Sequence, residues 1–320
     1  MPLTYDDVAT TTIERRSKKL ADNFSQNTAL LMRLNQKGNT RTFSGGRVIE
    51  EELMYAGPGN FQYYSGYQTL GTEQGDMLTM AEFSIKQAAV VVSMSGLEQI
   101  QNAGPEQFID LFGGRLDAAE KEMMNNLSVG VYSDGTGSGG KQIGGLQLLV
   151  SDAGTGTVGG IISSTYTWWK NQIYDFSDNS VTPGSATIIP AMNALYDQCS
   201  RNRDVPDLIV ADRTYFNYYL EALQPQQRFT NENLADAGFW NLKYRNADVV
   251  SDGGLSGDAP ASHMYFLNSD YIHWRPHAQR NMVQLDPKRF AVNQDAFARI
   301  IAFAGNMTVS NRSLQGVIVA

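Results

Sequence analysis

Residues 135–142 (GTGSGGKQ) have the composition of a phosphate-binding loop. They differ from the P-loop pattern at one position, because Gln142 stands where the pattern needs the hydroxyl of a Ser or Thr to bind magnesium. The residues that follow, 143–145 (IGG), do not begin a helix, so the helix N-terminus that would stabilise a bound phosphate is missing. The sequence therefore predicts a flexible turn here.

Residues 154–159 (GTGTVG) match the dinucleotide-binding fingerprint letter for letter. In a dinucleotide-binding site a helix starts within this pattern. Residues 160–164 (GIISS) show no helical periodicity, so that helix is not expected here. We interpret this segment as a turn between domains. An enzyme that binds a nucleotide through these two loops is the least favoured alternative for the whole chain.

The chain contains three histidines and one cysteine. His273 and His277 are four residues apart, but Pro276 between them excludes the helix that would direct both side chains at one metal ion. Cys199 lies on the apolar stripe of a predicted helix and is interpreted as a small core residue. No catalytic, cofactor-binding or metal-binding residue is predicted, so the sequence favours a structural protein over an enzyme.

The composition narrows the class of protein further. The chain has 320 residues, of which 42% are hydrophobic and only 18% charged, so it can bury a large core, which we expect to divide into two lobes. A single cysteine fits a reducing compartment, and the longest apolar run near residues 88–92 is too short to span a membrane. The net charge of −8 argues against general binding of DNA by the whole surface.

The charge is unevenly distributed along the sequence. Residues 1–41 contain seven Lys or Arg and four Asp or Glu, whereas the remaining residues are strongly acidic. A basic segment on an acidic protein could contact nucleic acid or an acidic neighbour, and an ordinary helical face of mixed charge is the alternative. The candidates for contact with DNA are Arg15, Arg16, Lys18 and Lys19.

The segment from residue 41 to residue 94 predicts one very long hairpin. Its strand-like limbs, 41–55 and 77–94, flank a tip rich in Gly and Tyr. Limbs of roughly 20 residues would reach on the order of 65 Å, and an isolated two-stranded ribbon is marginally stable in water. We therefore expect the hairpin to lie on another molecule. The candidates for an assembly interface at its tip are Phe61, Tyr63, Tyr64 and Tyr67.

The remaining sequence predicts an α+β fold. We expect a helical N-terminal arm that stops at Lys37 and Gly38, and a long helix that begins near Gly104 and ends at 126–130. A strand is expected at 143–150, followed by a separate α/β lobe. The lobe should contain helices at 188–199 and 215–223 and strands at 208–210, 249–250, 264–267 and 271–274, with two further strand segments at 297–303 and 307–310.

Taken in order, four short segments carry a resemblance to a known family. They are 63–67 (YYSGY), 133–136 before 143–146 (SDGT, IGGL), 159–161 before 168–171 (GGI, WWKN), and 305–316 (GNMTVSNRSLQG). In this arrangement the chain resembles the major capsid protein of tailed double-stranded DNA phages, which has the Hong Kong 97 fold. The resemblance implies an N-terminal arm (1–40), an extended loop (41–92), a peripheral domain (93–160 and 286–320) with a long spine helix, and an axial domain (161–285).

The resemblance also implies a function. Such proteins assemble in the host bacterial cytoplasm into hexamers and pentamers of an icosahedral shell, the virion capsid, which encloses phage DNA and contacts it weakly. Implied partners are other copies of the chain, a portal protein, and separate scaffolding and decoration proteins; no cofactor and no membrane are implied. Because the hairpin begins only about forty residues in, we expect no N-terminal segment to be removed on maturation. An encapsulin-type nanocompartment that packages protein cargo is the alternative.

Some capsid proteins of this fold form covalent Lys–Asn crosslinks between subunits. Lys86 is the one lysine in the predicted hairpin and is therefore the only candidate donor, which adds it to the interface candidates. The sequence identifies neither a partner Asn nor the Glu that would act as base.

Overall fold

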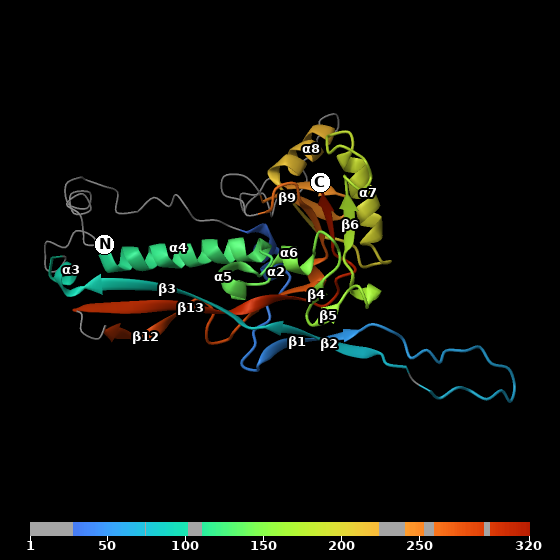
Figure 1. Ribbon diagram of the computed structural model, residues 1–320, viewed down its shortest axis with the longest axis horizontal. Helices are drawn as coiled ribbons and strands as arrows, with labels where there is room; N and C mark the ends of the chain where they lie inside the picture. Colours follow the sequence, from blue (N-terminus) through green and yellow to red (C-terminus); the bar gives the residue numbers. More distant parts are fainter. Residues whose placement is uncertain (1–27, 74, 102–110, 224–240, 253–258, 291–294) are drawn as a thin grey trace.

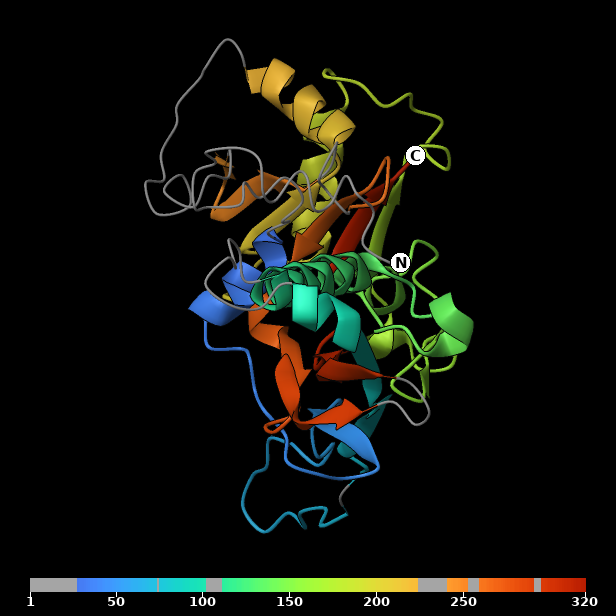
Figure 2. The same cartoon turned by 90° about the vertical axis from the view of Figure 1, so that its left-hand side faces the viewer.

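The computed structural model describes most of the chain, and its elements form two parts, which we call the body and the lobe (Figure 1). A β-hairpin, β1–β2, projects beyond the body on the side away from the lobe, as the second view also shows (Figure 2). The described residues are 28–73, 75–101, 111–223, 241–252, 259–290 and 295–320. The basic candidates Arg15, Arg16, Lys18 and Lys19 and the predicted helix start near Gly104 lie outside them.

The body is a four-stranded antiparallel sheet covered by one long helix. Its central strand pairs with β3 along one edge and with β12 and then β11 along the other. The alternation of β3 directs Val92 and Met94 to the buried face, while the helix contributes Ala119, Met123 and Leu127. The elements are β3 (Lys86–Ser95), α4 (Leu111–Tyr132), β11 (Ile272–Pro276), β12 (Val283–Phe290) and β13 (Ala296–Val309).

The lobe is a six-stranded mixed sheet in the order β6-β14-β10-β7-β9-β8. Helices α7 and α8 pack on one face, and the other face joins the core of the body. Successive residues of β7 are therefore all buried, with Ile209 in one cluster and Val210 in the other. The elements are β6 (Gln172–Asp175), α7 (Ile188–Gln198), β7 (Leu208–Ala211), α8 (Arg213–Leu223), β8 (Asn241–Tyr244), β9 (Ala247–Ser251), β10 (Met264–Leu267) and β14 (Gly316–Val319).

These elements confirm the predicted α+β class, together with the two helices and the central strands of the lobe. The remaining elements include the two strands of the hairpin. They are α2 (Ala29–Gln36), β1 (Val48–Met54), β2 (Leu78–Ser84), α3 (Gly96–Gln101), α5 (Gly137–Gly140), α6 (Leu146–Leu149), β4 (Thr157–Val158), β5 (Ile161–Ile162), η1 (Thr167–Trp169) and η3 (Ser269–Tyr271).

Two predictions about local structure were wrong. The expected strand at 143–150 is instead the short helix α6. Gly145 precedes it, and a Cβ there would lie 2.4 Å from the carbonyl oxygen of Val131, so this contact requires glycine. The second limb of the hairpin is also not one strand. It divides at Ile85 into β2, which pairs with β1, and β3, which pairs with β13 in the body.

Two strands near the C-terminus connect the sheets of the body and the lobe. The C-terminal strand β14 lies within the lobe sheet, parallel to β6, whereas β11 belongs to the body sheet. The chain therefore passes between lobe and body several times. These crossings are held together by buried polar side chains.

Arg312 lies at the crossing between β13 and β14 and is completely buried. Its guanidinium donates hydrogen bonds to the carbonyl oxygens of Leu149 (2.7 Å) and Trp169 (3.0 Å) and to the side-chain oxygen of Asn171 (2.8 Å). Burial lowers the pKa of Arg312 to about 10, which leaves it charged at neutral pH. One side chain thus joins the C-terminal segment to the segment that enters the lobe.

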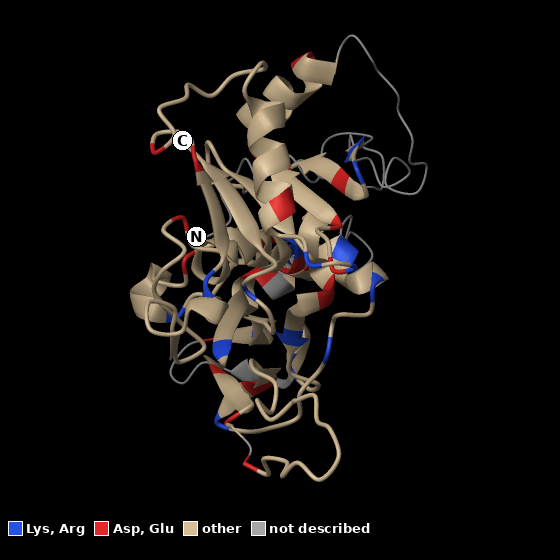
Figure 3. Cartoon of the chain, turned by 90° about the vertical axis from the view of Figure 1, so that its right-hand side faces the viewer, with Lys and Arg blue, Asp and Glu red and all other residues tan. Residues whose placement is uncertain are grey.

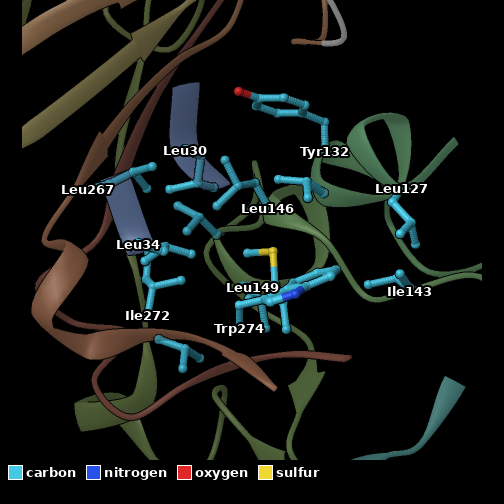
Figure 4. Close-up of a cluster of buried hydrophobic side chains, with 14 of the residues drawn as sticks. Leu30, Leu34, Leu127, Tyr132, Ile143, Leu146, Leu149, Leu267, Ile272 and Trp274 are labelled. Carbon is cyan, nitrogen blue, oxygen red and sulfur yellow. The ribbon is translucent and has the colours of Figure 1, made fainter. Parts of the chain in front are cut away.

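Two neighbouring contacts complete this junction. Buried Gln315 accepts a hydrogen bond from the backbone N–H of Asn268 and donates one to its carbonyl oxygen. Asp207 accepts hydrogen bonds from Ser269 and from Arg33 of α2. Burial acts to raise the pKa of Asp207, but the Ser269 bonds and the Lys37 ammonium outweigh it and lower the pKa. Helix α2 is thereby fixed to the lobe beside the core shown in Figure 4.

We predict that Arg312→Lys destabilises the chain by about 2 kcal/mol or more, because an ammonium cannot replace the planar fork and leaves buried acceptors without donors. Chemical denaturation measures the free energy of unfolding. Arg213→Lys is the matched control, since Arg213 is exposed, and should change stability by less than about 0.5 kcal/mol. Equal effects of the two substitutions would contradict the role given to Arg312.

Candidate assembly interface

The base of the hairpin packs on the chain's own body. Strands β1 and β2 pair antiparallel from Val48 opposite Ser84 to Met54 opposite Leu78. Their inner face is buried, which differs from the expectation that the whole hairpin would lie on another molecule. The buried inner residues are Ile49, Glu51, Leu53, Ala81 and Phe83.

A buried carboxylate fixes this base. Glu51 of β1 accepts hydrogen bonds from Arg275 Nε of β11 and Thr308 Oγ1 of β13, both at 2.7 Å. Burial lowers the pKa of the nearby His273 imidazole, although Glu51 acts to raise it. Arg275 Nη2 also forms an ion pair with the Glu51 carboxylate, so Arg275 is the direct charge partner of Glu51. The hairpin is therefore attached by a charged pair in addition to apolar packing.

The turn between β4 and β5 also supports the hairpin, through contacts with β2. The backbone N–H of Glu82 donates to the carbonyl oxygen of Gly159 (2.9 Å). Gly159 has φ +61°, and a Cβ there would lie 2.7 Å from the Cβ of Ala81. The second glycine-rich segment thus provides close backbone approach to the hairpin, and β4 and β5 take the place of the helix that a dinucleotide site needs.

Contact with the chain's own body ends near Tyr55, whose ring stacks on Trp168 at a centroid distance of 5.1 Å. The loop that follows, residues 56–76, contains only two charged residues, both acidic, and its described residues 56–73 and 75–76 are exposed. Figure 3 shows this loop, at the bottom of the view, mostly without charge. The exposed fractions are 81% for Phe61, 92% for Tyr63 and 64% for Tyr64, and Tyr67 is fully exposed.

The exposed apolar surface continues along the outer face of the hairpin onto Met54, Leu78 and Met80. Large contiguous apolar surfaces on soluble proteins mark sites of interaction. Aromatic side chains suit such sites because they offer a large contact area with few rotatable bonds. The structure thus brings the four aromatic candidates together on one projecting loop.

Lys86 lies apart from these residues. It is the first residue of β3, on the body, and its ammonium donates a hydrogen bond to the carbonyl oxygen of Gly140. The segment around Gly140 is a four-residue turn in which Ser138 and Gly139 have positive φ, so the first glycine-rich segment does not open a long helix. A crosslinking role for Lys86 stays a prediction.

A second exposed apolar feature was not found from the sequence. Helix α3, at the end of the body opposite the hairpin loop, exposes Leu97 and Ile100 (Figure 1). Ser95 and Glu98 form reciprocal hydrogen bonds, and the Arg115 guanidinium donates two more to Glu98. The spacing Ser95-x-x-Glu98 is a capping box and could have indicated this helix.

The histidines, the cysteine and the carboxylates of the described residues form no recognisable metal site. No group of three or more His, Cys, Asp or Glu among them could hold a metal ion. His273 is buried in a strand, His263 faces Asp152, and burial raises the pKa of the Cys199 thiol. No helix within this part of the chain combines the length and apolar character needed to cross a lipid bilayer.

The fold is shared with solved capsid structures. The sequence matches no protein-family model and no curated protein sequence. A chain of the cyanophage A-1(L) capsid is similar at TM-score 0.71 and 18% identity, with 99% of this chain and 98% of that chain covered. A chain of the cyanophage P-SCSP1u capsid is similar at TM-score 0.59 and 10% identity, over 98% and 94%.

The SrpI encapsulin of Synechococcus elongatus is also similar, at TM-score 0.56 and 9% identity, over 99% of this chain and 96% of that chain. The similarity spans the chain from end to end in each case, while the identities are low. The comparisons therefore establish the fold, which phage capsids and an encapsulin have in common.

We predict that Glu51→Gln destabilises the chain by about 2 kcal/mol, because it leaves the cation of Arg275 without its buried counter-charge. Denaturation and limited proteolysis of the hairpin measure the effect. Glu52→Gln is the control: the neighbouring side chain is exposed on the outer face. A hairpin that is cleaved equally slowly in both variants would show that Glu51 does not anchor it.

We predict that replacing Tyr63, Tyr64 and Tyr67 together with Ser prevents or weakens self-association, while circular dichroism and melting of the subunit stay near normal. The reason is that these rings contact little of their own chain. Light scattering measures association, and Glu73→Gln in the same loop is the control. A subunit that melts several degrees lower yet associates normally would assign the rings to the subunit's own core.

Proposed function

We propose that this chain is the major capsid protein of a tailed phage, a structural subunit whose copies form the hexamers and pentamers of an icosahedral shell around double-stranded DNA. The observation that supports this most is the projecting aromatic loop on a fold that matches a cyanophage capsid chain from end to end. Such a loop is of little use to a monomer, whereas a shell depends on contacts between copies.

The affinity would be distributed over many contacts. Exposed ion pairs contribute only about 0–1 kcal/mol each, so a shell of this type relies on buried area and on repetition. The hairpin loop and α3 lie at opposite ends of the subunit and would contact different neighbours. The division into arm, extended loop, peripheral domain and axial domain is part of this proposal.

Further partners follow from the proposed role. A portal protein, scaffolding and decoration proteins and the packaged DNA would contact the assembled shell in the virion, after assembly in the host cytoplasm. Arg15, Arg16, Lys18 and Lys19 are proposed to face the DNA. The contacts with DNA should be weak, because the chain as a whole carries a net charge of −8.

An encapsulin-type shell is the second candidate, and the similarity to the SrpI encapsulin favours it. The two functions differ in cargo and not in the architecture of the subunit. An enzyme that uses the glycine-rich segments is disfavoured, since one forms a short turn and the other supports the hairpin.

We predict that the purified chain forms closed particles or capsomers of five or six copies under electron microscopy. Nucleic acid is the expected content of particles isolated from the native source. Protein cargo in the absence of nucleic acid would favour the nanocompartment. A chain that stays monomeric in light scattering across protein concentration and salt would contradict both shell functions.

A further inference from the structure

A groove between α2 and α4 is bounded by uncharged residues only. It encloses about 600 Å³, and its apolar surface comes from Leu31, Met124, Leu127, Trp274 and Phe303. Figure 4 shows Leu127 and Trp274 in the cluster of buried side chains that continues beneath it. An uncharged apolar groove of this size fits an apolar segment of polypeptide.

Two other grooves in the described part of the chain differ in this respect. The groove between the hairpin and Trp168 contains Asp76 and Glu82, and the groove beside His263 contains Asp152 and Asp175. Carboxylates would disfavour an apolar occupant in either place because they would lose hydration. Of these three grooves, the one between α2 and α4 is therefore best suited to apolar side chains.

Thr28, which lies at the edge of this groove, has an unusual environment. It is the N-cap residue of α2, yet its hydroxyl makes no capping hydrogen bond. The side chain is buried, with the residue only 6% exposed, and Oγ1 has no hydrogen-bond partner within the described residues. An unpaired buried hydroxyl therefore lies at the residue where the preceding segment enters the edge of the groove.

We propose that residues 1–27 of the same chain bind in this groove through Ile13, Leu20 and Phe24. On a helical wheel these three side chains fall within about 40° of one another. The cations Arg15, Lys18 and Lys19 fall on the opposite half of the wheel, whereas Arg16 lies about 60° from the centre of the apolar side. Binding of the apolar side would leave Arg15, Lys18 and Lys19 available to phosphate groups outside the groove.

The position of the segment in the chain favours it over a separate partner. Residue 28 lines the groove, so the preceding residues are already next to it. Binding within one chain avoids the entropy cost of bringing two molecules together and proceeds at a high effective concentration. A second copy supplying its own residues 1–27 is the competing occupant.

Disulfide trapping tests this proposal in the purified chain, whether it is a subunit or part of a particle. Phe24→Cys is combined with Met124→Cys in the groove. The matched control combines Phe24→Cys with Glu122→Cys, which lies on the exposed side of the same helix. Native Cys199 is buried and does not interfere. Mild oxidation should give about tenfold more intrachain disulfide for the groove pair than for the control.

A second measurement uses the double variant Leu20→Asp/Phe24→Asp. Releasing the segment should make Met282, which lines the groove, oxidise about threefold faster in hydrogen peroxide, as followed by mass spectrometry. Exposed Met54 on the hairpin is the internal reference and should not change. Equal trapping in both cysteine pairs, disulfide-linked dimers instead of intrachain bonds, or an unchanged Met282 rate would each overturn the proposal. None of these outcomes depends on whether a shell forms.

Discussion

The buried guanidinium of Arg312 is the contact on which the relation of lobe to body depends. Arginine is seldom buried without a carboxylate partner, because removing its charge from water costs free energy. Here neutral oxygens of three residues on the segment 149–171 satisfy it. Two segments that lead into the lobe meet at this point. Residues 149–171 precede β6 of the lobe, and Arg312 lies between β13 of the body and β14 of the lobe. A single side chain thus fixes two crossings that are about 150 positions apart in sequence, and Gln315 fixes a third.

The hairpin has a base that is fixed to the body and an end that is exposed. Glu51 lies in the middle of β1 and is bound by two strands of the body, so the seven-residue ladder cannot swing freely. Beyond Tyr55 the loop has few hydrogen bonds to the rest of the chain. Its position in space is therefore set by the base, while its conformation can adapt to the surface it meets.

The sequence predicted those elements whose signal is local. The apolar runs of β7 and β10 predicted strands, and the stripe on α7 indicated its buried side. The aromatic loop was found from composition alone. The division of residues 77–94 was missed because β2 and β3 read as one continuous strand. Only their partners differ, and the partner of β3 lies about 200 residues away in the chain.

Other features depend on contacts that no local pattern contains. Residues 143–150 have the sequence pattern of a strand. The close approach of Gly145 to the carbonyl oxygen of Val131, just before α6, explains the turn and cannot be seen in that pattern. The burial of Arg312 could not be predicted, since an isolated arginine in a polar loop is normally exposed. For α3 the capping box was visible, but two exposed apolar residues in six do not by themselves identify an interface.

The placement of the two exposed apolar features limits how copies could associate. The aromatic loop and α3 lie at opposite ends of the subunit and differ in character: one is long and adaptable, and the other is a short helix fixed by Arg115. A self-complementary dimer would pair identical surfaces and leave the other end of each subunit exposed. Head-to-tail contacts between unlike surfaces continue from copy to copy and close into a ring when the rotation allows it. Two unlike exposed surfaces at opposite ends of the subunit therefore favour head-to-tail association over isolated pairs.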